Sequence, residues 1–133
     1  MKGFHHIRLE LAREPQHPHG DSRDGWDIVA ALDEDGRLDL DACRAEPKRC
    51  FVRRFMRDAT VATGHLRHSF GHRWILDLEG RDELDASGFQ LGEEKFVLGE
   101  YVSIVSADGE AHTYGVERLE RLGQDARADP AAR

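Results

Sequence analysis

The sequence predicts a mainly β protein (α+β at most): a single-domain antiparallel sheet closed as a small barrel or folded as a sandwich, with one short helix near residues 39–46. Three observations predict this class. Apolar and polar residues alternate with a period of two along most of the chain. Segments rich in glycine, proline and polar residues separate these runs. The 133 residues have the size of one domain and contain no internal repeat.

The first strand is expected at residues 4–13. Ile7 and Leu9 share one face of this strand, while Arg8 and Glu10 share the other, as in a half-buried strand. Further strands are expected at residues 26–32, 50–56, 61–70, 73–78, 95–106 and 110–122. The last of these also fits a helical turn, but the HTYGV that opens it favours a strand. Six or seven strands with short connections are typical of a small antiparallel barrel or sandwich.

Residues 38–49 form the only segment with a helical pattern. Asp39 or Asp41 is expected to cap this helix, and Pro47 is expected to end it. Long loops are predicted at 14–25 and 78–88, and turns at 33–36 and 106–109. Residues 1–122 are therefore expected to form one β-rich domain, and residues 123–133 a disordered tail.

Charge and composition exclude several classes of partner. Lys and Arg number 19 and Asp and Glu 26, which gives a net charge of −7. Nucleic acids and anionic membranes require a basic surface, so neither is expected as a partner. The chain has no apolar run long enough to span a membrane and no signal peptide at its start, so the expected location is the cytoplasm. Cys43 and Cys50 form no CxxC pair and are expected to be small buried hydrophobes.

Three histidines lie within eight residues, in HLRHSFGHRW. A regular strand directs His65 and His68 to opposite faces, so the two cannot share a metal without a bulge or a bend. A turn after Phe70 would allow His72 to fold back beside His68, which leaves a two-ligand hairpin site open. The spacing favours exposed histidines that flank a turn, and no metal is predicted.

Two other histidines lie on faces that are expected to point inward. His5 shares its face with Ile7, and His112 shares its face with Tyr114. If the first and last strands pair to close a barrel, His5 and His112 are expected near each other. The first interpretation is two histidines that are hydrogen-bonded at the edge of the core. The alternative is a pocket lined by imidazoles, which suits acid–base chemistry.

The arginines of CFVRRFMRD form a second candidate group. Arg53 and Arg54 occupy opposite faces of the predicted strand, so one of them is expected on the same side as aromatic residues. A partly buried guanidinium requires a partner. The first interpretation is an internal carboxylate, from Glu10, Asp77 or Glu79. The alternative is a small anionic ligand that the arginine grips through two hydrogen bonds.

The segment 88–116 has apolar residues on both faces of its central strand. Tyr101 and Val105 share one face, and Val102 and Ile104 share the other. A strand that is apolar on both sides is covered on both sides. A core on one side and a second subunit on the other would supply that cover, so a homodimer is expected.

The chain resembles a family of small uncharacterised bacterial proteins, a domain of unknown function. Four segments carry the resemblance across roughly residues 4 to 118: FHHIRLELAR, DGWDIVAALDEDGRLD, CRAEPKRCFVRRF and FVLGEYVSIVSADGEAHTYGV. The resemblance implies a compact, mostly β protein and supplies no catalytic residues. The stretch HLRHSFGHRW is richer in histidine than the family pattern.

No catalytic motif is present: the sequence has no GxSxG, no GxxxxGK[ST], no GxGxxG and no HExxH. The sequence leaves open whether the protein is an enzyme, and no cofactor is predicted. The first functional hypothesis is a non-enzymatic β domain that acts through self-association or a protein partner. The alternative is a small-molecule-binding or enzymatic barrel with a pocket lined by His5, Arg53, Tyr101 and His112.

Overall fold

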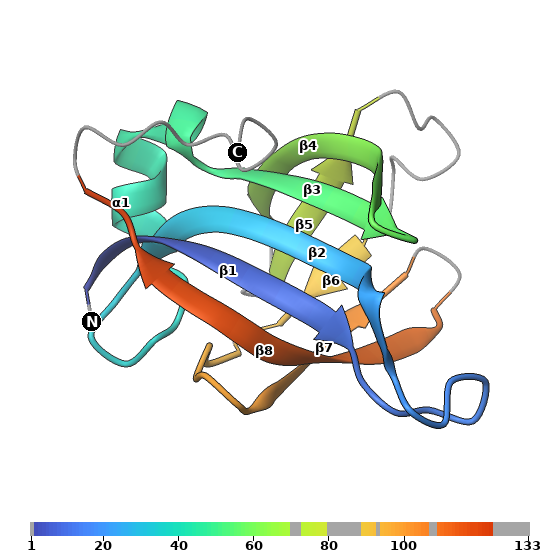
Figure 1. Cartoon of the computed structure of the whole chain (residues 1–133). Coiled ribbons are helices and arrows are strands. Elements are labelled where there is room, and N and C mark those ends of the chain that lie inside the picture. The colour runs from blue at the N-terminus through green and yellow to red at the C-terminus, as the bar shows by residue number, and fades with distance from the viewer. Residues whose placement is uncertain (1, 70–72, 80–88, 93, 107–108, 124–133) are drawn as a thin grey trace.

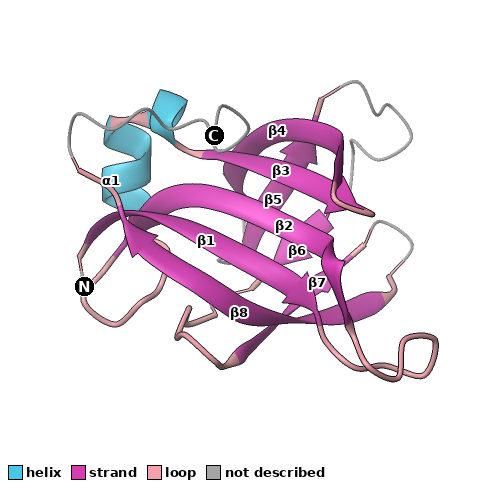
Figure 2. Cartoon of the chain, in the orientation of Figure 1, coloured by secondary structure: helices cyan, strands magenta, loops and turns pink. Residues whose placement is uncertain are grey.

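Eight antiparallel strands form a closed barrel in which each strand pairs with its neighbours along the chain and the last pairs back to the first (Figures 1 and 2). The computed structural model describes residues 2–69, 73–79, 89–92, 94–106 and 109–123. The predicted mainly β fold is confirmed in its barrel form. The strands are β1 (Gly3–Leu11), β2 (Asp21–Leu32), β3 (Phe51–Met56), β4 (Ala59–Ser69), β5 (Arg73–Leu78), β6 (Phe89–Leu91), β7 (Tyr101–Val105) and β8 (Ala111–Arg121).

The inward face of the barrel follows the predicted alternation. Ile7 of β1 pairs with Ile28 of β2, which pairs with Val52 of β3, and the side chains of all three are fully buried. Period two directs every second residue of each strand into this interior. The apolar faces of all eight strands are thereby removed from water, which is the main driving force for the fold.

Glycine allows two pairs of strands to approach closely. A Cβ atom on Gly25 of β2 would collide with the carbonyl oxygen of Leu9 on β1. A Cβ on Gly64 of β4 would collide with the carbonyl oxygen of Asp77 on β5. Both glycines therefore mark places where the sheet bends so sharply that only a residue without a side chain fits.

A short helix, α1 (Leu40–Ala45), lies beside one end of the barrel (Figure 1). The Asp39 side chain accepts a hydrogen bond from the Ala42 amide at 3.2 Å, as predicted for the cap. A single turn of 3₁₀ helix, η1 (Pro47–Arg49), follows the helix and leads into β3. Cys43 of α1 and Cys50 just before β3 are both buried and unpaired by a disulfide, as expected of small apolar side chains.

We call this end of the barrel the α1 end. It is the end at which β2, β4 and β6 finish and at which β1, β3, β5 and β7 begin. None of the helices among the described residues has the length and apolar character needed to cross a lipid bilayer.

The predicted strand at 95–106 is wrong in its first half. Regular pairing is confined to Tyr101–Val105, and residues 94–100 form an irregular segment with a turn. Gly99 in this turn has a φ of +85°, which ends the extended conformation. Phe96 is nonetheless fully buried, because the segment crosses the α1 end and its amide donates to the Gly36 carbonyl at 2.8 Å.

Two other boundaries differ from the predictions. β2 begins at Asp21, so the predicted loop at 14–25 is shorter than its composition suggested. The three-residue strand β6 was not predicted. Most of the predicted acidic loop at 78–88 and nearly all of the predicted tail at 123–133 lie outside the described residues.

Candidate functional site

The four residues of the predicted pocket do not converge in the structure. The first and last strands do pair, but the pairing is antiparallel, so His5 lies opposite Arg121 at the α1 end. His112 lies near the start of β8, beside the chain that leaves β1 at the opposite end of the barrel. Arg53 points to the outer face of β3, and Tyr101 is exposed on the outer face of β7.

Arg53 belongs to a buried ion-pair network on the outside of β1, β2 and β3. Its guanidinium donates to the Asp27 carboxylate at 2.7 Å, and His6 Nε2 lies 2.7 Å from the other oxygen of the same group. The side chain of Asp27 is only 2% exposed. Arg8 stands 3.7 Å from Asp27 and places its guanidinium 4.2 Å from the centre of the Phe55 ring.

The internal partners of the arginines differ in part from those predicted. Arg53 pairs with Asp27, and Arg54 pairs with Asp24 at 2.7 Å, whereas Glu10, Asp77 and Glu79 were expected. Glu10 and Asp77 do take part in ion pairs, with Arg8 and Arg67. The expectation that one arginine shares a side with an aromatic residue is confirmed, since the Arg54 guanidinium lies 5.2 Å from the Trp26 ring centre.

The two inward-facing histidines have separate surroundings. Burial lowers the pKa of His5, whose Nδ1 lies 2.9 Å from the Gly3 carbonyl oxygen. His112 lies between two carboxylates: its Nδ1 is 3.0 Å from Glu14 Oε2, and its Nε2 is 3.0 Å from Glu110 Oε1. Each of the two histidines has a local polar partner, which agrees with the first interpretation of the sequence.

The histidines at 65 and 68 point to opposite faces of β4, as the strand period predicted. His65 is outward, beside Glu79 at 3.2 Å. His68 pairs in register with Trp74 of β5, and its ring packs edge-to-face on the indole with ring centres 4.9 Å apart. His72 lies outside the described residues. Within the described part of the chain, no group of three or more His, Cys, Asp or Glu side chains is arranged to hold a metal.

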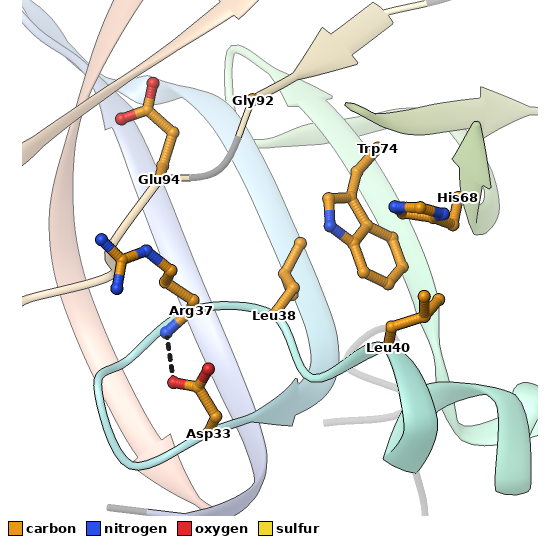
Figure 3. A pocket seen from close by; sticks show the side chains of 8 residues that line it. All are labelled: Asp33, Arg37, Leu38, Leu40, His68, Trp74, Gly92 and Glu94. Carbon is orange, nitrogen blue, oxygen red and sulfur yellow. Dashed lines mark hydrogen bonds between the residues drawn. The ribbon is translucent and has the colours of Figure 1, made fainter. Parts of the chain in front are cut away.

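The His68–Trp74 pair forms one wall of a cavity at the α1 end of the barrel, shown in Figure 3. The cavity has a volume of about 200 Å³. We call it the mouth cavity. Its lining comes from the β2–α1 connection, from the first residue of α1, from β4 and β5, and from the segment after β6. The lining residues are Asp33, Arg37, Leu38, Leu40, His68, Trp74, Gly92 and Glu94.

Backbone hydrogen bonds fix the walls of the mouth cavity. The Asp33 side chain accepts from the amides of Asp35 and Arg37, at 2.8 and 3.0 Å, and so closes the turn after β2. Gly36 in that turn has a φ of +86°. The Gly36 carbonyl accepts from the Phe96 amide, which joins the turn to the segment after β6. The two irregular walls are therefore tied to each other as well as to the barrel.

Several polar groups in the mouth cavity lack a partner in the described part of the protein. Within the described residues, neither the ring nitrogens of His68 nor the carboxylate of Glu94 forms a hydrogen bond or an ion pair. The closest anionic partner of the Arg37 guanidinium is Asp35, at 3.8 Å, which does not line the cavity. Polar groups that are withdrawn from bulk water usually have partners. The mouth cavity thus presents an imidazole, a carboxylate and a guanidinium to whatever enters it.

No protein-family model, no curated protein and no solved structure matches this chain. The residues of the mouth cavity were missed by reasoning from the sequence, which assigned Asp33 to a solvated turn and His68 to the flank of another. The available signal was the strand parity of His68 and Trp74. In a hairpin that turns near Phe70, these two side chains lie opposite each other on the same face.

Proposed function

We propose that this protein is a small-molecule-binding β-barrel whose ligand occupies the mouth cavity. One observation carries the proposal. Arg37, His68 and Glu94 have no strong partner in the part of the chain that the structure describes, and they line the same cavity as the Trp74 indole. Ligand sites commonly combine apolar and aromatic walls with a few polar groups that fix orientation. Eight-stranded barrels have room for one small ligand at most, which agrees with the size of this cavity.

The buried interior of the barrel supports the mouth as the place for a ligand. The centre is filled by apolar side chains of the strands, and Trp26, one of the largest of them, is fully buried there. The Arg54–Asp24 pair and Trp26 occupy the region toward the opposite end. Leu38 and Leu40 instead line the mouth cavity and pack against the core, so they offer an apolar surface to a ligand.

A fragment screen followed by backbone-amide NMR tests this proposal. Small aromatic compounds with one polar group are expected to shift the amide signals of the Asp33–Leu40 turn, of His68 and of Glu94. His68→Ala should weaken such binding about fivefold, which corresponds to the ~1 kcal/mol of one lost hydrogen bond. His65→Ala is the matched control, because His65 lies three residues away on the outer face of the same strand.

Two results would contradict the proposal. One is a screen in which no compound binds, although the protein is folded. The other is a set of binding compounds whose shifts lie on the outer face of the barrel and are unaffected by His68→Ala.

A second function, self-association, is favoured by a different observation. Three large apolar side chains within five residues are exposed: Val97 by 43%, Leu98 by 61% and Tyr101 by 64%. A second copy of the chain that covers this patch would remove all three from water. Light scattering of the wild type is expected to report a dimer, and Leu98→Glu is expected to report a monomer.

Met56→Glu is the control for this second proposal, because Met56 is 44% exposed in another part of the barrel. It should leave the dimer intact. A wild-type protein that stays monomeric at high concentration would rule out self-association and would leave the proposed ligand site unaffected.

A further inference from the structure

We infer that the ligand of the mouth cavity is a small organic cation, with a protonated amine or a quaternary ammonium group on an aromatic or alkyl body. This inference rests on the proposed ligand-binding function and specifies its chemistry. Three features of the cavity carry it: its charge balance, the availability of one carboxylate, and its aromatic wall.

The charge balance of the mouth cavity is negative. Among the residues that the structure describes, two carboxylates, those of Asp33 and Glu94, line it together with one guanidinium, that of Arg37. The Arg37 side chain is 42% exposed, and its nearest anionic partner, Asp35, lies outside the cavity lining. Solvent and Asp35 therefore screen much of the charge of Arg37. A cleft lined with an excess of one charge attracts ligands of the opposite charge, and the net charge of −7 on the whole chain acts in the same direction.

Glu94 is the carboxylate available to a cationic group. One oxygen of Asp33 already accepts two backbone hydrogen bonds, so this side chain is committed to its turn. Glu94 has no partner among the described residues, and it is only partly exposed. An ammonium group that reaches Glu94 would form a charge-assisted hydrogen bond with a carboxylate that no other group occupies.

Trp74 provides the aromatic wall that an organic cation requires. Tryptophan offers the most favourable ring face for cation–π contacts. His68 packs edge-to-face against the indole and so holds its orientation, as Figure 3 shows. Leu38 and Leu40 complete the apolar surface on which the body of the ligand would lie.

Neutral and anionic ligands fit these features less well. A neutral aromatic molecule would pack on Trp74 but would leave Glu94 without a countercharge. An anion would find one solvent-exposed partner in Arg37 and two carboxylates that repel it. The cavity therefore favours a positive group by attraction and disfavours a negative group by repulsion.

Three probes of similar shape but different charge test the inference: phenethylamine, phenethyl alcohol and hydrocinnamate. Each consists of a phenyl ring on a short chain that ends in an ammonium, a hydroxyl or a carboxylate group. Titration calorimetry at neutral pH is expected to show phenethylamine binding about tenfold more tightly than phenethyl alcohol, since one charged contact contributes on the order of a tenfold change. Hydrocinnamate should bind most weakly.

A pair of charge-removing variants locates the preference. Glu94→Gln is expected to reduce the tenfold preference for phenethylamine to less than about threefold, because the affinity for phenethylamine falls more than the affinity for phenethyl alcohol. Asp58→Asn is the matched control, because it removes one negative charge at the opposite end of the barrel. Asp58 has a φ of +64°, a conformation that asparagine tolerates well, so this variant should retain the wild-type preference.

The possible outcomes separate the two proposals. If phenethyl alcohol or hydrocinnamate binds in the mouth cavity as tightly as phenethylamine, the cation inference fails and the binding function stands. If Glu94→Gln keeps the full preference for phenethylamine, the inference fails as well. If none of the three probes binds and the fragment screen also finds no ligand for the mouth cavity, both proposals fail.

Discussion

Replacing Asp27 with asparagine tests how the outer network stabilises the barrel. The wild-type carboxylate is 2% exposed and lies 2.7 Å from both the Arg53 guanidinium and His6 Nε2. The substitution keeps the size of the side chain but removes its charge. Among the described residues, Arg53 then contacts no anion. The asparagine offers one acceptor oxygen to two donors, Arg53 and His6, while the Thr60 hydroxyl still accepts from Arg53 at 2.7 Å.

The expected loss follows from these contacts. A hydrogen bond to a charged group contributes about 1.5–3 kcal/mol, and Asp27 makes two short ones. The Arg53 side chain is 16% exposed, so water can hydrogen-bond to it and offset part of the lost free energy. The free energy of unfolding should therefore fall by about 3 kcal/mol. For a domain of this size the thermal midpoint should fall by roughly 10 °C.

Urea denaturation followed by circular dichroism measures this loss, and Asp77→Asn provides the control. Asp77 also pairs with an arginine across the outer face of the sheet, but the distance to Arg67 is 3.3 Å and the two side chains are 39% and 49% exposed. Such an exposed pair contributes at most about 1 kcal/mol. Equal losses in Asp27→Asn and Asp77→Asn would refute the reasoning that burial makes the Asp27 network strong.

The dependence of this loss on pH gives a second test. Burial by itself would raise the pKa of Asp27, but hydrogen bonds from His6 and Arg53 and the charge of Arg8 outweigh it and hold the pKa below its ordinary value of 3.8. The unfolded chain therefore binds the proton more readily than the folded one. The contribution of Asp27 is complete above about pH 5 and is lost as the pH falls through 3.8 toward the folded pKa. The difference in stability between wild type and Asp27→Asn should shrink in that range.

Three further outcomes are expected. Gly64→Ala should abolish folding, because its Cβ would collide with the Asp77 carbonyl, whereas Gly123→Ala, which meets nothing within 4 Å, should fold normally; yield and circular dichroism distinguish them. His5→Gln should reduce the loss of unfolding free energy that accompanies acidification. Burial lowers the pKa of His5 from 6.5, so the stability that this histidine contributes is lost as the pH falls below 6.5. Urea titrations at two pH values measure the change in unfolding free energy. Asp39→Ala should lower the free energy of unfolding by about 1 kcal/mol in the same assay, because α1 loses its cap.

The sequence predicted the strands well where alternation runs for six or more residues. β1 alternates clearly and was found close to its predicted bounds. β8 was also found close to its predicted bounds, although its sequence fits a helical turn as well. β6 was missed because three residues are too few to show a period. The segment before β7 was wrongly predicted as part of a strand for another reason. Phe96 is apolar and buried, but it is buried by covering the α1 end rather than by pairing in the sheet.

The site was harder to predict than the fold because turns and irregular segments supply half of it. Asp33, Arg37 and Glu94 have no periodic signature, and Asp33 lies in a segment that was predicted as a turn. Only the closure of the barrel brings the turn after β2 against the segment after β6. The positions of His68 and Trp74 in their strands could be compared from the sequence. That comparison indicates that the two side chains share a face of the sheet, but it does not indicate a cavity.

The residues that were first predicted to line a pocket do not lie together, because they are polar groups that already have partners. His5, Arg53 and His112 are polar groups on strands, and each already has a neighbouring partner. His5 and Arg53 find theirs in the sheet, at Gly3 and Asp27, and His112 finds Glu14 in the connection after β1. A polar side chain in a regular sheet has fixed cross-strand neighbours, and one of these neighbours is commonly its hydrogen-bond partner. A side chain at the end of a barrel has neighbours on fewer sides. Its unused hydrogen-bonding groups are therefore available to a ligand. In this fold the groups to test first are therefore those at the ends of strands, and Glu94, which follows β6 and has no partner among the described residues, is the first of them.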